Sequence, residues 1–177
     1  MRRLGSAELS SEEVASLREL FRAAWSESSD PFTEEDWDHA VGGMHFILEE
    51  GEGITAHAAV VERELHTGGY RLATGYVEAV ATWPTHQRRG RASALMREVD
   101  EYIDRAFPLG ALDTGRTAFY ERLGWVAWKG PTFVRTDSGL IRTAEEDGQV
   151  LVRLTPTSPD LDLSAPISCD WRPGDVW

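Results

Sequence analysis

The sequence contains a single cysteine and no long apolar run. Cys169, alone in 177 residues, excludes an internal disulfide framework and a cysteine-rich zinc site. We expect it to be a small, partly buried hydrophobic side chain. The chain also has no stretch of about 18 apolar residues and no charged-then-apolar leader, which predicts a cytoplasmic protein without a membrane partner.

Positive charge is also scarce. Lysine and arginine number 18 against 30 aspartates and glutamates, a net charge of −12. This balance argues against nucleic acid and anionic membranes as partners and favours a cationic one, although acidity can also serve solubility alone. The histidines do not fall in metal-binding spacing, so we expect no metal. His57, within an apolar segment, is interpreted as a core histidine whose hydrogen bonds are satisfied.

Neither an internal repeat nor a linker interrupts the chain, so we expect one domain over residues 1–177. Apolar periodicity predicts helices that begin near residues 11 and 33, a third that runs to about residue 105, and a short one over 117–123. Strands are predicted over 45–48, 54–65, 70–81, 109–112, 125–129 and 149–154. Loops are predicted over 136–147 and 156–177. A helix joins the strands 70–81 and 109–112, which makes that pair parallel and the class mixed α/β.

One basic, glycine-containing loop carries the clearest functional signal. Gln87 to Ala92 (Gln-Arg-Arg-Gly-Arg-Ala) lies between the strand that ends at Ala81 and the long amphipathic helix. Its backbone N–H groups, the close approach that Gly90 allows and the positive end of the helix dipole favour an anionic ligand, most often a phosphate.

Two motifs resemble those of a known superfamily. The Gln-x-x-Gly-x-Ala loop resembles the pyrophosphate-binding motif of the GNAT N-acetyltransferases, and Phe119 to Trp125 is similar to their second acetyl-CoA motif. The resemblance implies the GNAT acyl-CoA N-acyltransferase fold: a mixed, mostly antiparallel central sheet with helices on both faces and a splayed pair of parallel strands. It implies acetyl-CoA as co-substrate, bound by Val80, Ala81, Thr82, Gln87, Arg88, Arg89, Gly90, Arg91 and Ala92.

Further segments narrow the resemblance to the aminoglycoside 2'-N-acetyltransferases. These segments are Phe32 to Trp37, Gly42 to His45, Gly75 to Glu78, Trp128 to Thr132, Thr143 to Gly148 and the terminal Cys169 to Trp177. The match covers nearly the whole chain. The terminal nonapeptide Cys-Asp-Trp-Arg-Pro-Gly-Asp-Val-Trp is the most diagnostic part, because general acetyltransferases do not share it.

Glu78 is the first catalytic candidate. A substrate ammonium becomes a nucleophile only after a base removes its proton. A carboxylate within the apolar run Val77 to Ala81 is costly unless it faces a cleft, a ligand or a partner. A surface glutamate or one paired with arginine is the alternative. The resemblance implies that Glu78 acts as the base through a water molecule.

Tyr120 is the second catalytic candidate, since a positioned phenol can protonate the departing CoA thiolate. The alternative is a tyrosine that only packs on a short helix. Main-chain N–H groups near Val80, where the parallel strands splay, are expected to hold the developing oxyanion.

Acidic residues are the candidates for binding a polycationic acceptor. Each alone is more simply a solvated surface residue, but the family topology implies that their loops surround the acceptor cleft. The predicted substrate-binding residues are Asp30, Asp36, Glu78, Ala79, Asp113, Glu145, Glu146, Asp175 and Trp177. The free carboxylate of Trp177 adds another anion, and its ring can present a flat face to a sugar.

Three departures from the family pattern affect these acids. Pro31 stands where an acid would precede Phe32, Asp113 replaces a small hydroxyl residue before a shorter loop, and Glu145-Glu146 replaces aspartates. They leave the acetyl chemistry alone and bear on acceptor preference.

The sequence thus predicts an acetyl-CoA-dependent aminoglycoside 2'-N-acetyltransferase that confers aminoglycoside resistance by direct attack in a ternary complex. The resemblance favours a homodimer. Two alternatives stay open: the same chemistry on a polyamine, an amine metabolite or a peptide N-terminus, and a non-catalytic module that binds acetyl-CoA or aminoglycoside.

Overall fold

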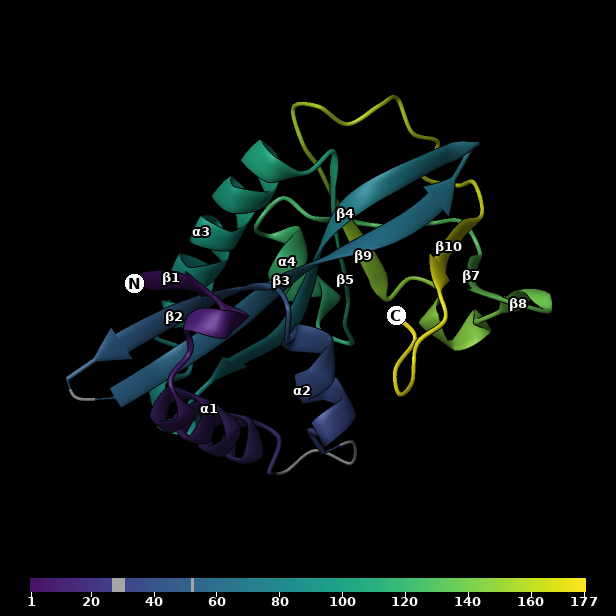
Figure 1. Ribbon diagram of the computed structural model, residues 1–177. Coiled ribbons are helices and arrows are strands. Elements are labelled where there is room, and N and C mark those ends of the chain that lie inside the picture. The colour runs from purple at the N-terminus through teal and green to yellow at the C-terminus, as the bar shows by residue number, and fades with distance from the viewer. Residues whose placement is uncertain (27–30, 52) are drawn as a thin grey trace. The chain divides into compact units, whose positions relative to one another are not determined.

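A computed structural model describes residues 1–26, 31–51 and 53–177 of the chain. The helices are α1 (Ser11–Ala24), α2 (Glu34–Ala40), α3 (Arg91–Ala106) and α4 (Thr117–Glu121), with 3-10 turns at Ser6–Glu8, Pro84–His86 and Ala144–Glu146. The strands are β1 (Arg2–Gly5), β2 (Met44–Glu50), β3 (Gly53–Thr67), β4 (Tyr70–Thr82), β5 (Leu109–Asp113), β6 (Val126–Ala127), β7 (Thr132–Thr136), β8 (Gly139–Arg142), β9 (Val150–Leu154) and β10 (Ile167–Asp170) (Figure 1).

The described chain divides into two compact units. Unit 1 comprises Met1–Val61 and Val77–Val99, and unit 2 comprises Glu62–Tyr76 and Asp100–Trp177. Strands β3 and β4 and helix α3 contribute residues to both, so the chain passes from one unit to the other within continuous elements.

Both helices at the start of unit 1 begin at capping boxes. Ser10 Oγ accepts from the Glu13 N–H while Glu13 accepts from the Ser10 N–H, at 3.2 and 2.8 Å. Thr33 and Asp36 repeat this arrangement at α2, which begins close to the predicted residue 33. Each cap satisfies amide groups that have no acceptor within the helix, a contribution of about 1 kcal/mol.

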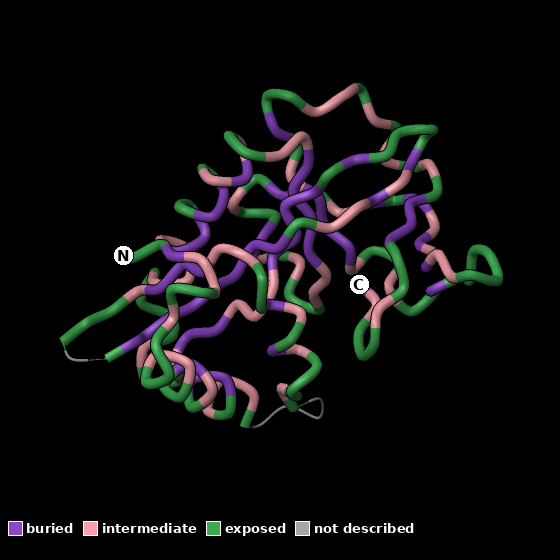
Figure 2. Tube along the Cα trace, in the orientation of Figure 1, coloured by how far each residue is buried: buried purple, intermediate pink, exposed green. Residues whose placement is uncertain are grey.

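The sheet of unit 1 is antiparallel. Strand β1 pairs with β2, and β2 pairs with β3 (Figure 1). The register sets Ile47 opposite His57 and His45 opposite Ala59. The first part of β3 is buried along most of its length (Figure 2). Apolar side chains of α1, including Leu17, Leu20 and Phe21, form one core cluster with Ile47 and others.

Unit 2 contains a mixed sheet with the strand order β6-β9-β5-β4-β3-β10-β7-β8. Strands β4 and β5 are parallel, and so are β10 and β7, whereas β5–β9, β6–β9, β3–β10 and β7–β8 are antiparallel. Gly75 and Gly110 pair across β4 and β5, and a Cβ at either position would lie 3.0 Å from the side chain of Ile103 in α3. Only glycine therefore lets the second half of α3 pack this closely on the parallel pair.

The mixed, mostly antiparallel α/β class predicted from the sequence is confirmed, but four strands were missed. Strand β7 follows the predicted strand 125–129, β8 lies in the predicted loop 136–147, β10 lies in the tail predicted to be irregular, and β1 precedes the first predicted helix. All are short, and β8 is exposed along its whole length, with Leu140 61% exposed. Strands of four or five residues offer too few positions to show a clear alternation in the sequence.

Candidate functional site

The loop that follows β4 has the backbone conformation of an anion cradle. Arg88 and Gly90 both adopt positive φ angles, 59° and 78°. Nothing lies within 4 Å of the position that a Cβ at Gly90 would occupy. The loop is therefore open at the point where a ligand would approach the main chain.

Helix α3 begins directly after this loop. The first helical hydrogen bond runs from the Ala94 N–H to the Gly90 oxygen at 2.9 Å, so the N–H groups of residues 91–93 have no acceptor within the helix. The first turn carries no acidic residue. These amides and the helix dipole fit the pyrophosphate of a coenzyme A group.

The predicted cofactor residues of this loop differ in what they contact. Arg88 and Arg89 are exposed, whereas Arg91 forms an ion pair with Glu50. Gln87 donates from Nε2 to the Thr82 oxygen at 3.1 Å and so stabilises the loop itself. Arg88 and Arg89 are the side chains best placed to meet phosphate charge.

Strand β4 contains a kink directly after Glu78. Ala79 adopts φ 51°, the left-handed region that alanine rarely occupies, and this interrupts the two-residue alternation along the strand. Glu78, Ala79 and Val80 are all half-buried. In unit 2 the parallel ladder with β5 ends at the pair Tyr76 and Ala111, so pairing stops two residues before Glu78.

Sequence reasoning missed a hydrogen-bonded pair of buried histidines beside this kink. His57 Nδ1 lies 2.8 Å from the Ala79 oxygen, and His57 Nε2 lies 2.8 Å from His45 Nδ1. Burial lowers the pKa of His45 to about 4 and that of His57 to about 3. The interpretation of His57 as a satisfied core histidine is confirmed, but its partners depend on strand register, which the sequence does not reveal.

Tyr120, in unit 2, lies at the end of α4. Its side chain is 7% exposed and packs edge-on against the Phe119 ring, with centroids 4.9 Å apart, and against Trp125. Burial raises the pKa of the phenol above its usual value. The group therefore stays protonated and can act as a hydrogen-bond and proton donor.

Three of the predicted substrate-binding acids influence one another within unit 2. Burial raises the pKa of Glu146, and the charges of Glu145 and Asp175 raise it further. Asp147 has a structural role instead. It forms an ion pair with Arg142 and accepts a hydrogen bond from the Thr132 N–H at 3.1 Å, and these two interactions lower its pKa to about 2. Of residues 145–147, Glu145 and Glu146 thus form an acidic group with Asp175, whereas Asp147 forms a structural ion pair with Arg142.

The C-terminal residue is fixed to the loop that carries these acids. Trp177 Nε1 donates to Thr143 Oγ1 at 3.0 Å, and Arg172 donates to the Trp177 oxygen at 2.9 Å. Arg63 donates to the Val176 oxygen at 2.6 Å. The Trp177 side chain is only 4% exposed, which leaves little of its ring for a sugar, and Arg172 offsets part of the terminal charge.

The structure says less about substrate binding by the remaining predicted acids. Asp36 Oδ2 accepts from the N–H and hydroxyl of Thr33, at 2.7 and 2.9 Å, so the helix cap alone accounts for an aspartate there. Asp113 is half-buried at the end of β5. Asp30 lies outside the described residues. Substrate contacts of these three acids stay predictions.

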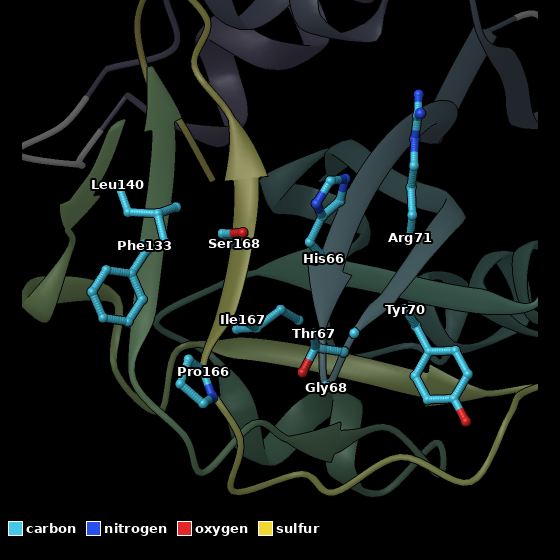
Figure 3. Close-up of a pocket in the computed structure, with 11 residues that line it drawn as sticks. His66, Thr67, Gly68, Tyr70, Arg71, Phe133, Leu140, Pro166, Ile167 and Ser168 are labelled. Atoms are coloured by element: carbon cyan, nitrogen blue, oxygen red, sulfur yellow. The ribbon is translucent and has the colours of Figure 1, made fainter. Parts of the chain in front are cut away.

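One hollow in unit 2 is lined by none of the predicted site residues. It has a volume of about 390 Å³ and lies between the turn that joins β3 to β4 and the strands β7, β8 and β10 (Figure 3). His66, Tyr70 and Phe133 are among its lining residues. Within residues 1–26, 31–51 and 53–177, no cluster of three or more histidine, cysteine or acidic side chains could hold a metal ion. No helix in this part of the chain is long and apolar enough to cross a membrane.

Comparison with known proteins identifies the family. Residues 7–127 match the model of the acetyltransferase (GNAT) domain. The chain is also 43% identical to the aminoglycoside 2'-N-acetyltransferase of Mycolicibacterium fortuitum, over 82% of this chain and 77% of that protein. The chain belongs to the GNAT acetyltransferase family. Acetyl transfer from acetyl-CoA is therefore the chemistry of this fold, as the two sequence motifs predicted.

Solved structures confirm the GNAT fold. Escherichia coli ElaA superposes with a TM-score of 0.62 at 17% identity, over 86% of this chain and 97% of that one. A GNAT family acetyltransferase from Brucella melitensis, solved in complex with acetyl-CoA, superposes with a TM-score of 0.58 at 17% identity. The match covers 91% of this chain and 92% of that one. This chain spans about a third of three longer solved chains, 32–33% of their length.

Proposed function

We propose that this GNAT enzyme transfers the acetyl group of acetyl-CoA to the 2'-amine of aminoglycoside antibiotics and so confers resistance to them. The grouping of Glu145, Glu146 and Asp175 carries the acceptor half of the proposal. The relative from Mycolicibacterium fortuitum, which bears this activity in its name, supports it over most of the chain.

The acidic group suits a polycationic acceptor. Burial and the like charges of Glu145 and Asp175 raise the pKa of Glu146, so these three carboxylates repel one another. Ammonium groups of an aminoglycoside would relieve this repulsion and form charge-assisted hydrogen bonds. The net charge of −12 further raises the local concentration of a cation.

The chain supplies a base from strand β4 and an acid from helix α4. Acetyl-CoA, when bound, supplies an activated acetyl thioester. Glu78, half-buried beside the kink of β4, removes the proton of the acceptor ammonium through a water molecule. Tyr120, whose phenol stays protonated, delivers a proton to the leaving sulfur.

The loop after β4 holds the cofactor. The exposed Arg88 and Arg89, the amides at the start of α3 and the open backbone at Gly90 bind the pyrophosphate, with Val80, Ala81 and Thr82 alongside the thioester arm. We also propose that residues 1–177 act as one domain, which the three elements shared by both units support. The family resemblance supports a cytoplasmic homodimer.

A matched pair of acceptors tests the proposal. Kanamycin B carries an amine at the 2' position where kanamycin A carries a hydroxyl group. We expect steady-state acetylation of kanamycin B to exceed that of kanamycin A by about 100-fold or more in kcat/KM. Equal rates would reject the 2' assignment. Faster acetylation of spermidine or of a peptide N-terminus would favour another cationic amine as the acceptor.

A further inference from the structure

Four hydrogen bonds join the N-terminal segment of unit 1 to the kink of β4. The Gly42 N–H donates to Ser6 Oγ at 2.8 Å, and Ser6 Oγ lies 2.8 Å from His45 Nε2. His45 Nδ1 lies 2.8 Å from His57 Nε2, and His57 Nδ1 lies 2.8 Å from the Ala79 oxygen. Both imidazoles are completely buried.

With both rings neutral, only one arrangement of protons satisfies the bond between them. The Ala79 carbonyl can only accept, so a neutral His57 carries its proton on Nδ1 and accepts at Nε2. His45 therefore donates from Nδ1 to His57 and accepts at Nε2, where the Ser6 hydroxyl, which also lies 3.2 Å from the Gly43 oxygen, is the available donor. The hydrogen bonds run in one direction, from Gly42 to Ala79. The lowered pKa values of both rings, caused mainly by burial, agree with neutral imidazoles.

The last bond fixes the peptide plane between Ala79 and Val80. A trans peptide is planar, with its C=O and N–H pointing in opposite directions. The chain contains no cis peptide among its described residues. Because the Ala79 carbonyl points toward the buried His57, the Val80 N–H points away from it. The same bond stabilises the left-handed Ala79, a conformation that alanine adopts only at a cost.

We infer that His57, oriented by His45 and Ser6, is a positioning residue of the acetyl-transfer site: it fixes the kink that aims the Val80 N–H and the Glu78 side chain. This inference rests on the proposed function, which assigns Glu78 as base and the main chain near Val80 as the oxyanion donor. His57 touches no reacting atom. It acts through the Ala79 carbonyl.

The packing around the two rings holds them in place. The His57 ring lies edge-on to Phe21, with centroids 5.2 Å apart, and His45 lies 6.1 Å from Trp37. These neighbours exclude water from both rings. A buried imidazole with both nitrogens engaged is held rigidly, as a positioning residue requires.

The tautomers can be measured directly on the wild-type protein. In ¹⁵N-histidine NMR at pH 7 we expect both rings to be neutral, each with its proton on Nδ1. A proton on Nε2 of His57, or a charged ring at this pH, would overturn the inference. This measurement needs no acceptor, so it decides the hydrogen-bond chain even where the enzyme proves to acetylate no aminoglycoside and the proposed function fails.

Two substitutions at one site separate positioning from packing. His57→Asn keeps an N–H donor near the Nδ1 position, whereas His57→Leu removes it, and both lose the bond to His45. We expect the Val80 amide resonance to move in His57→Leu and to stay within error in His57→Asn. We expect kcat to fall about 10- to 100-fold in His57→Leu, while the KM for acetyl-CoA stays within twofold of wild type. In His57→Asn most of the lost kcat should be restored. Equal losses in both variants, or an unmoved Val80 amide in a folded His57→Leu, would show a packing role alone.

Discussion

At the scale of single residues, the site depends on how Glu78 is presented. It is half-buried and lies one residue before the left-handed Ala79. A carboxylate in this setting can be shielded enough to accept a proton and exposed enough to pass it to water. Its role in catalysis is separable from cofactor binding, because the anion cradle lies after the end of β4.

Replacement of Glu78 by glutamine should remove the base with little change in shape. We expect kcat to fall by about 100- to 10,000-fold, since general base catalysis typically contributes this much. The dissociation constant for acetyl-CoA should stay within twofold of wild type. Calorimetry and steady-state kinetics measure the two quantities. Glu98→Gln, on the exposed side of α3, is the matched control and should retain wild-type kcat. Unchanged turnover in Glu78→Gln would remove Glu78 as the base.

The residues of this site were predictable from the sequence to different degrees. Glu78, Tyr120 and Gly90 stand in recognisable motifs, and their roles stay predictions. The structure leaves Glu78 half-buried, raises the pKa of Tyr120 by burial and leaves the space at Gly90 open. The left-handed Ala79 was not predictable, because alanine carries no signal for positive φ. The pairing of His45 with His57 was not predictable either, since it follows from the register of β2 on β3.

At the scale of helices and strands, the longest elements had the clearest hydrophobic periodicity in the sequence. Helix α3 and strands β3 and β4 have enough buried positions to show their period in the sequence, and their predicted positions agree with the structure. Strand β10 was missed because it spans four residues and its first three are all buried, which shows no alternation. Its consequence for the site is large, since it precedes the tail that ends at Trp177.

The C-terminal tail should affect acceptor binding, because it anchors the loop that carries Glu145 and Glu146. Trp177 donates to Thr143, which directly precedes the turn carrying Glu145 and Glu146. We expect deletion of Trp177 to raise the aminoglycoside KM about tenfold, because the loop loses its anchor. The KM for acetyl-CoA should not change. Trp171→Ala, in the same tail but 60% exposed, is the control. An unchanged aminoglycoside KM after the deletion would exclude a binding role for the C-terminal residue.

At the scale of the whole molecule, buried ionisable groups set the response to acid. The pKa values of His45 and His57 are lowered to about 4 and 3, so below pH 6.5 the unfolded chain takes up protons that the folded chain cannot. Asp100 acts in the opposite direction. Burial raises its pKa to about 6, although Arg153 and the Trp125 N–H oppose the shift, so the folded chain takes up a proton first. Of these three groups, the two histidines thus destabilise the fold in acid and Asp100 stabilises it.

Replacement of Asp100 by asparagine should change how steeply the free energy of unfolding depends on pH. Between pH 6 and 4 the wild-type free energy of unfolding should decrease with acidification by about 1.4 kcal/mol per pH unit, the net effect of about one proton. Asp100→Asn removes the group that binds a proton in the folded state over this range, and its amide oxygen can still accept from Trp125 Nε1. The variant should therefore lose stability about twice as steeply, because the histidines then act unopposed. Urea unfolding at several pH values measures both slopes. Parallel slopes would mean that Asp100 does not take up this proton, and a flat wild-type profile would mean that the buried histidines do not resist protonation.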